Sequence, residues 1–128
     1  MRNVSVMVAV ALLWTAASLR AQEGHPLSGT WAGECGAQRS HVTIVMAWDG
    51  KAVTGTINPG PDAIPIAAVA LDASTWTVRI EADGKDAGGK PAHITAEGRI
   101  DDLGSYHRRI VGTWTQGTAK GDCRLTRD

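Results

Sequence analysis

The sequence has few of the features that mark the commonest functional classes. Its 128 residues contain no phenylalanine, one tyrosine and two cysteines, and its 13 basic residues are balanced by 13 acidic ones. A chain without excess positive charge has no broad electrostatic field to attract nucleic acid or anionic lipid. It also lacks a glycine-rich phosphate loop and the paired ligands of a zinc motif. We therefore set aside nucleic acid as a partner and expect no cofactor.

The N-terminus, in contrast, has the pattern of a signal peptide over residues 1–21. Arg2 provides a positive charge, and the apolar run Val4–Ala17 that follows is too short to be a comfortable membrane span. We predict cleavage after Ala21, with cleavage after Ser18 as the alternative. An uncleaved anchoring segment is the competing interpretation.

Residues 22–128 then form the mature chain, which is long enough for one domain and too short for two. Arg2 and Arg20 leave with the signal peptide, so 11 basic residues remain against 13 acidic ones and the mature net charge is about −2. No stretch of membrane-spanning length is left in the mature chain. We expect a secreted or periplasmic domain without a membrane span.

Both cysteines, Cys35 and Cys123, lie in the mature chain. In an oxidising compartment such a pair most simply forms a disulfide. On the chain-entropy account, a bond between positions so far apart stabilises the fold by roughly 4 kcal/mol. Two buried free thiols, or half of a metal site without its other ligands, are the alternatives.

Apolar and polar residues alternate along most of the mature chain, and this period of two indicates β-strands with one buried face. Val78 and Ile80, for example, flank Arg79. Turn sequences such as Asp49-Gly50 and Asn58–Asp62 separate the alternating runs. The pattern predicts eight strands, over residues 28–36, 40–48, 51–58, 63–71, 74–82, 92–100, 105–115 and 118–127.

Residues 63–73 are the one mature segment whose alanine content would permit a helix. Pro65 and the β-branched Ile64 and Ile66 disfavour it. We interpret this segment as a strand with apolar surroundings on both faces.

Eight short strands joined in sequence are expected to close, because closure removes exposed sheet edges. The cysteines predict the register of the closing seam, since the residue numbers of an antiparallel pair have a constant sum. If the cysteines face each other, Trp31 faces Arg127 and Gly33 faces Leu125. The guanidinium of Arg127 can then cover the indole of Trp31, which makes them the predicted barrel-closing pair. The predicted fold is an all-β, eight-stranded, antiparallel up-and-down β-barrel.

Several short motifs resemble those of the calycins, the group that includes lipocalins and avidins. Gly29-Thr30-Trp31 is similar to their Gly-x-Trp opening, and Gly112-Thr113-Trp114 repeats it. Val53–Ile57 resembles the second hairpin of avidin-like barrels, and Gly121–Arg127 resembles the last strand of small secreted bacterial barrels. The resemblance implies a lipocalin-like barrel in outline. The C-terminal helix of lipocalins and the biotin-holding residues of avidins have no clear counterparts in this chain.

Both large residues and many small ones, such as Gly98 and Gly112, are assigned to the inner face, and one interpretation is that the small residues leave a ligand cavity walled by tryptophan. The candidate ligand-binding residues are Trp48, Trp76, Tyr106, Arg108 and Trp114. A buried Arg108 would need a partner, and a ligand anion could be one. The alternative is that the indoles simply fill the interior, because eight strands leave room either for packed side chains or for one small ligand.

Histidines and carboxylates form no clear catalytic or metal-binding pattern. His41, His93 and His107 are assigned to the solvent face, and none has a second ligand at a suitable spacing in its strand. Glu81 and Glu97 are expected to form cross-strand ion pairs with arginines. We predict no catalytic residue and no metal site.

Three functions remain consistent with the sequence. The first is a secreted or periplasmic binding barrel for a small, partly apolar ligand. The second is a protein-binding module, such as an inhibitor or an accessory subunit of an envelope complex, that uses the loops Asn58–Asp62 and Asp83–Pro91. The third and least favoured is a barrel-mouth enzyme, such as a cyclase or isomerase, in which Tyr106, Arg108 and Glu34 would converge. The expected partners are a small-molecule ligand or an envelope protein.

Overall fold

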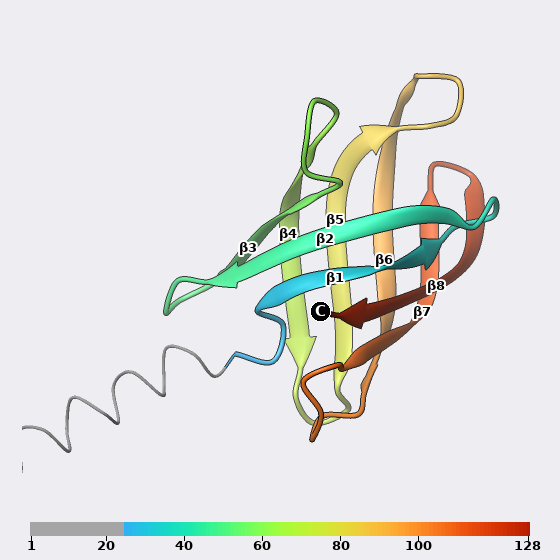
Figure 1. Ribbon diagram of the computed structural model, residues 1–128. Helices are drawn as coiled ribbons and strands as arrows, with labels where there is room; N and C mark the ends of the chain where they lie inside the picture. Colours follow the sequence, from blue (N-terminus) through green and yellow to red (C-terminus); the bar gives the residue numbers. More distant parts are fainter. Residues whose placement is uncertain (1–24) are drawn as a thin grey trace, which may run out of the picture.

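Eight antiparallel strands wind in chain order into a closed barrel (Figure 1). The structure is a computed structural model that describes residues 25–128. The strands are β1 (Gly29–Cys35), β2 (Ser40–Trp48), β3 (Val53–Ile57), β4 (Ile64–Asp72), β5 (Thr77–Lys85), β6 (Pro91–Asp101), β7 (Arg109–Gln116) and β8 (Ala119–Arg127). No helix occurs within the described residues, so the predicted all-β barrel is confirmed. The predicted signal peptide, residues 1–21, lies outside them.

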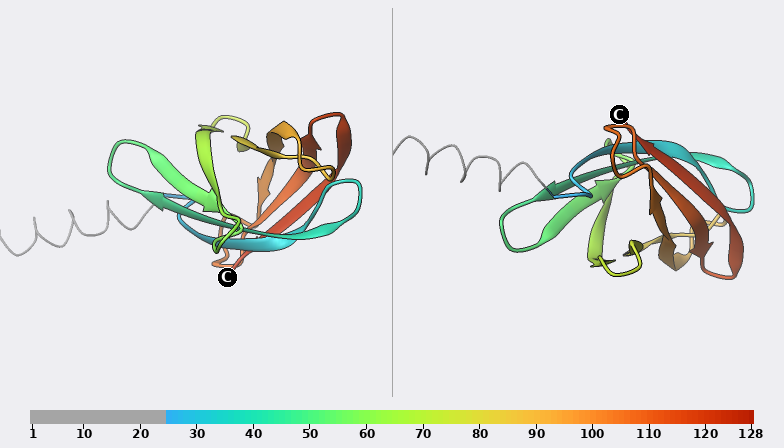
Figure 2. Two further views of the ribbon diagram at one scale, coloured as in Figure 1. Left: turned by 90° about the horizontal axis from the view of Figure 1, so that it is seen from above. Right: turned by 90° about the horizontal axis from the view of Figure 1, so that it is seen from below.

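The strands alternate in direction between two ends of the barrel, which we call the mouth and the base. The β1–β2, β3–β4, β5–β6 and β7–β8 loops surround the mouth, whereas the other loops and the segment before β1 lie at the base. In Figure 1, β1 and β2 cross in front of β4, β5 and β6. Figure 2 shows from above and below that β1 and β2 lie along one side of the barrel. The sheet therefore wraps around an interior that is occupied by buried side chains.

Alternate residues of the strands point into this interior and form a largely aliphatic core. The large side chains with less than 2% exposure are Trp31, Leu27, Ile44, Ile57, Ile80, Ile94, Leu125 and Val78. Complete burial of a side chain of this size contributes about 1.5–3 kcal/mol relative to exposure. The alternation that predicted the strands is therefore also the main source of their stability.

Two facing glycines allow β6 and β7 to approach closely. Gly98 and Gly112 are register partners, and a Cβ on Gly112 would collide with the backbone of Glu97 and Gly98. Glycine inside a strand commonly marks such a close backbone approach. The small inward-facing residues at this position bring strands together and do not widen a cavity.

The seam between β1 and β8 has the predicted register. Cys35 is opposite Cys123, and the two form a disulfide. Trp31 is opposite Arg127, whose guanidinium carbon lies 6.0 Å from the centroid of the indole. A covalent bond near the mouth and a cation–π contact at the base therefore hold the same pair of strands.

Arg127 also closes the base of the barrel through backbone carbonyls. The residue is only 9% exposed; its Nε–H donates to the carbonyl oxygen of Tyr106 at 2.9 Å and its Nη1 to that of Ser28 at 3.2 Å. Arg108 donates from Nη1 to the carbonyl oxygen of Pro26 at 3.2 Å. The two arginines thus join the segment before β1 to the β6–β7 loop.

The predicted strand bounds are least accurate at the base. β2 covers the predicted residues 40–48, but β5 begins at Thr77 and β7 at Arg109, three and four residues later than predicted. Trp76 has a φ of +54°, a left-handed conformation that belongs to a turn. Tyr106 lies in the β6–β7 loop and is 63% exposed, so its predicted inward orientation is wrong.

β4 is a strand, as predicted, but the outer face of this strand is open to solvent. Pro65, Ala67 and Ala70 are all exposed, so the predicted apolar surroundings on both faces are wrong. The register with β5 shifts between Ile66 and Ala68, which places a bulge at Ala67.

β3 and β4 are joined by only two residue pairs, Thr56 with Pro65 and Ile57 with Ile64, both near the mouth. Toward the base the strands separate, and a cavity of about 550 Å³ lies between them. By comparison, β5 and β6 form nine residue pairs. The β3–β4 seam is therefore the least extensively paired seam of the barrel.

Removal of the disulfide is expected to lower the free energy of unfolding by about 4 kcal/mol, because the bond links residues 88 positions apart and restricts the unfolded chain. Urea unfolding of the Cys35→Ala/Cys123→Ala double variant tests this against the oxidised wild type. Wild-type protein reduced with dithiothreitol gives a second measurement without a substitution. Unchanged stability in both samples would contradict the prediction.

Arg127→Lys is expected to destabilise the fold by about 2–3 kcal/mol. The ammonium group of lysine cannot reproduce the geometry in which the guanidinium donates hydrogen bonds to the carbonyl oxygens of both Tyr106 and Ser28. Arg124→Lys is the matched control, since it makes the same change at an exposed position of the same strand. Chemical unfolding of the control should show a loss below about 0.5 kcal/mol. Equal losses in the two variants would refute a special role for the buried guanidinium.

Candidate functional site

The structure divides the five predicted ligand-binding residues between the two ends of the barrel. Trp114, on β7, lies at the mouth, whereas Trp48, Trp76, Tyr106 and Arg108 belong to the end of β2 and the loops at the base. No single site contains all five. A ligand-binding role for any of them stays a prediction.

The polar residues at the base are engaged with the protein itself. The guanidinium carbon of Arg127 lies 4.8 Å from the ring centroid of Tyr106. Arg108 donates to two backbone carbonyls, each at 3.2 Å. Glu34 is exposed on β1 beside Arg124 of β8 and does not converge with Tyr106 and Arg108.

The two tryptophans at the base have different surroundings. Trp48 stacks on His25, with ring centroids 4.7 Å apart, and borders the cavity between β3 and β4. Burial lowers the pKa of His25 from its ordinary value of 6.5. Trp76 is half-buried against the core, and its carbonyl oxygen accepts the N–H of Ile100 at 2.9 Å.

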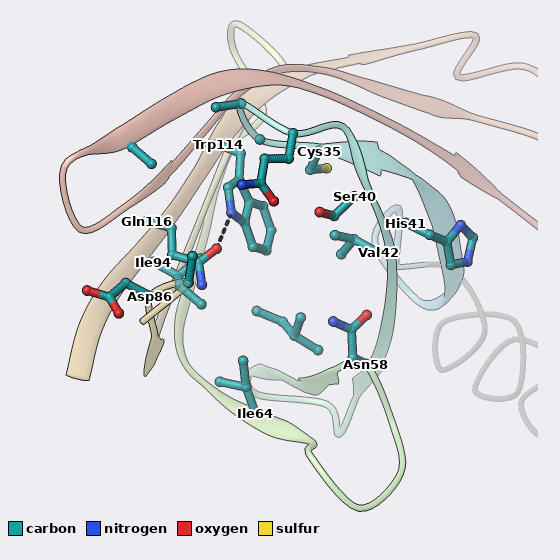
Figure 3. A pocket seen from close by; sticks show the side chains of 16 residues that line it. Cys35, Ser40, His41, Val42, Asn58, Ile64, Asp86, Ile94, Trp114 and Gln116 are labelled. Atoms are coloured by element: carbon teal, nitrogen blue, oxygen red, sulfur yellow. Dashed lines mark hydrogen bonds between the residues drawn. The ribbon is translucent and has the colours of Figure 1, made fainter. Parts of the chain in front are cut away.

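A second cavity, of about 350 Å³, opens at the mouth (Figure 3). Every strand except β5 contributes residues to its lining, and the loop that follows β5 contributes Asp86 and Ala87. Its larger apolar side chains are Val42, Ile57, Ile64, Ile94 and Trp114, and its polar ones are Gln38, Ser40, His41, Asn58, Asp86 and Gln116. The mouth therefore combines buried apolar residues with polar groups from the surrounding strand ends and loops.

Trp114 is held in the wall of this cavity by a short chain of hydrogen bonds. Its Nε1–H donates to Oε1 of Gln116 at 3.1 Å, the dashed line in Figure 3, and Nε2 of Gln116 donates to the carbonyl oxygen of Lys85. The tryptophan is 5% exposed. The indole is therefore a fixed apolar surface, and both ends of the Gln116 amide already have protein partners.

Asn58, directly after β3, is fixed to β2 by two hydrogen bonds. Its N–H donates to the carbonyl oxygen of Thr43 at 2.7 Å, and its Oδ1 accepts the N–H of Thr43 at 3.0 Å. Its φ of +50° is left-handed, a conformation that asparagine tolerates better than most residues. Sequence reasoning placed Asn58 in a turn but missed its position in the cavity wall. The Asn-Pro-Gly-Pro turn was the available indication of an unusual backbone there.

Full charges are scarce in the lining of the mouth. Asp86 is the one carboxylate among the lining residues, and none of them is a lysine or arginine. Oδ1 of Asp86 accepts the N–H groups of Gly88 and Lys90 at 2.9 and 3.0 Å. These bonds shape the β5–β6 loop, which spans residues 86–90 and is shorter than the predicted 83–91.

The predicted cross-strand ion pairs on the outer face are confirmed only for Arg79 with Glu97, because the contact of Arg79 with Glu81 lies within β5 and Arg99 forms no ion pair among the described residues. Arg79 contacts Glu97 at 3.0 Å and Glu81 at 3.2 Å. His93 lies 2.9 Å from Asp83 and 3.5 Å from Glu81, and these carboxylates, Asp83 foremost, raise the pKa of His93 above 6.5. The cluster is well exposed, and we interpret it as a solvated surface feature. Across residues 25–128, no group of three histidine, cysteine, aspartate or glutamate side chains could hold a metal ion.

No known protein family, curated protein or solved structure matches this chain. The barrel agrees with the fold that the calycin resemblance implied, whereas membership of that group stays a prediction. In the part of the chain that the structure describes, no helix is long and apolar enough to cross a membrane.

Trp48→Ala is expected to raise the pKa of His25 toward 6.5, because loss of the stacked indole exposes the imidazole to water. The pKa of His25 is lower in the folded state than in the unfolded state, so the unfolded state binds the proton more readily. The stability of the wild type therefore falls as the pH drops through 6.5. The variant should show a smaller fall.

An NMR titration of the imidazole protons measures the pKa of His25 in each protein. Trp76→Ala is the control, since Trp76 makes no ring contact with His25 among the described residues. A titration of His25 that is the same in wild type and Trp48→Ala would show that the indole does not cause the shift.

Proposed function

We propose that the protein is a secreted or periplasmic binding barrel that takes a small, partly apolar ligand at its mouth. The observation that carries this proposal is the 350 Å³ cavity, which has Trp114 and aliphatic side chains in its walls and polar groups around them. Small-molecule sites typically have volumes of about 300–1,000 Å³ and combine mostly apolar walls with a few placed polar groups. The cavity meets both descriptions.

The mouth is favoured over the base because fewer of its polar side chains form hydrogen bonds within the protein. At the base, the guanidinium groups of Arg108 and Arg127 are directed at backbone carbonyls. At the mouth, Ser40 and Gln38 make no side-chain hydrogen bond to any other described residue, and both border the cavity. Such groups are available to a ligand.

The Cys35–Cys123 disulfide supports the proposed secreted or periplasmic location, since such bonds persist in oxidising compartments. The N-terminal signal pattern of the sequence points the same way. We include a calycin-like relationship in the proposal, on the basis of the barrel and the Gly-Thr-Trp motifs.

Ala87→Trp is expected to weaken binding of a neutral apolar probe by about tenfold, because Ala87 lines the cavity and an indole at this loop position would occupy its opening. The probe is N-phenylnaphthylamine, whose fluorescence rises in apolar surroundings, excited directly so that tryptophan content does not matter. Ala73→Trp is the matched control, because Ala73 is exposed in the β4–β5 turn at the base.

The wild type and the control should bind the probe with the same affinity. If the wild type does not bind it, or if both variants bind it as tightly as the wild type, the mouth is not the binding site and the proposal fails.

A further inference from the structure

We propose that the mouth selects uncharged ligands carrying a hydrogen-bond acceptor, such as a carbonyl oxygen, and that the side-chain amide of Asn58 donates to that acceptor. This inference rests on the proposed function, because it names the chemistry of the ligand at the same cavity. It assigns Asn58 as the residue that determines specificity.

The hydrogen bond from Thr43 fixes the orientation of the Asn58 amide. The N–H of Thr43 can only donate, so the side-chain atom of Asn58 that faces it at 3.0 Å must be the oxygen. The backbone N–H of Asn58 bonds to the carbonyl oxygen of the same threonine at 2.7 Å. With the backbone and Oδ1 both fixed to β2, the direction of the NH₂ group is fixed as well.

The NH₂ group of Asn58 is available to a ligand. Within residues 25–128, Nδ2 of Asn58 has no hydrogen-bond partner, and Asn58 is one of the residues that line the cavity. Figure 3 shows its nitrogen on the side of the amide that faces the cavity. An amide nitrogen can only donate, so a ligand atom that meets it must be an acceptor.

The lining of the mouth disfavours a negatively charged ligand. An anion buried in the cavity would need a cationic partner, and no lysine or arginine lines the cavity. Asp86 contributes a negative charge at the rim, which disfavours an anion further. A carboxylate or sulfonate ligand is therefore disfavoured, whereas a ketone, amide or ester carries an acceptor without a charge.

Apolar side chains next to Asn58 can contact the apolar part of the ligand. Ile57 precedes Asn58 in the chain, and Ile64 is the register partner of Ile57 across the β3–β4 seam. Both line the cavity, together with Trp114. A ligand whose acceptor meets Asn58 can therefore lay its apolar body against these side chains.

The test uses Asn58→Asp and two neutral probes. Aspartate keeps the oxygen that accepts the N–H of Thr43 and tolerates a left-handed φ, but it replaces the donor with a second oxygen. Prodan, a naphthyl ketone, carries a carbonyl acceptor, and its emission moves to longer wavelength when that oxygen accepts a hydrogen bond. N-phenylnaphthylamine has a similar apolar body without a carbonyl.

The substitution is expected to weaken prodan binding by about tenfold, the equivalent of one hydrogen bond, and to shift bound prodan emission to shorter wavelength. Affinity for N-phenylnaphthylamine should change by less than about twofold. Asn58→Gly, which suits the backbone and also lacks the donor, should give the same pattern and provides the measurement if the aspartate variant does not fold.

The outcomes separate the two proposals. If the wild type binds neither neutral probe, the proposed function itself fails. If it binds both but the Asn58 variants retain full prodan affinity, or lose both probes equally while folded, the role of Asn58 is overturned and the binding cavity stands. Anilinonaphthalene sulfonate, an anion with a similar body, should bind at least tenfold more weakly than N-phenylnaphthylamine, and equal binding would overturn the preference for uncharged ligands.

Discussion

The constraint on which the rest of the structure depends is the register at which β1 meets β8. Because side chains alternate between the two faces of a strand, a slip of one residue at this seam would turn the inward residues of one strand to the solvent. Cys35 with Cys123 and Trp31 with Arg127 hold the same register at opposite ends of the seam. All the other neighbouring strands are consecutive in the chain and are joined by short loops. β1 and β8 are not, so the connectivity of the chain does not impose their pairing.

The two ends of the barrel differ in character. At the base, Arg127 on the last strand donates to the carbonyl oxygen of Ser28 before the first strand, so the end of β8 and the segment before β1 close this end of the barrel over buried side chains. At the mouth, a cavity opens among the strand ends and the β1–β2, β3–β4 and β5–β6 loops, with Ile57 and Ile94 in its walls. Apart from the cavity between β3 and β4, the base is thus closed by the protein's own side chains, whereas the mouth holds an open cavity lined by apolar and polar groups.

The alternation of apolar residues and the two cysteines were sufficient to predict the strand order, the barrel and its closing register. Trp76 and Tyr106 were misplaced because side chains alternate between the two faces only while the backbone stays extended. Trp76 itself is left-handed, and Tyr106 lies in a loop that begins at the left-handed Asp102. Asn58 could not be assigned to the site from sequence, because its orientation depends on Thr43, which lies 15 residues away on another strand. Local patterns predicted the wall of the barrel, whereas the mouth depends on contacts between loops that are distant in sequence.

The small number of pairs between β3 and β4 has a consequence for the dynamics of the barrel. Protein regions with few backbone hydrogen bonds open locally at a lower free-energy cost than the whole molecule unfolds. Here the only pairs that join these strands are Thr56 with Pro65 and Ile57 with Ile64, and the second pair also lines the mouth. Any molecule bound against Ile57 and Ile64 would therefore suppress local opening of this seam, so occupancy of the cavity and rigidity of the barrel are thermodynamically linked.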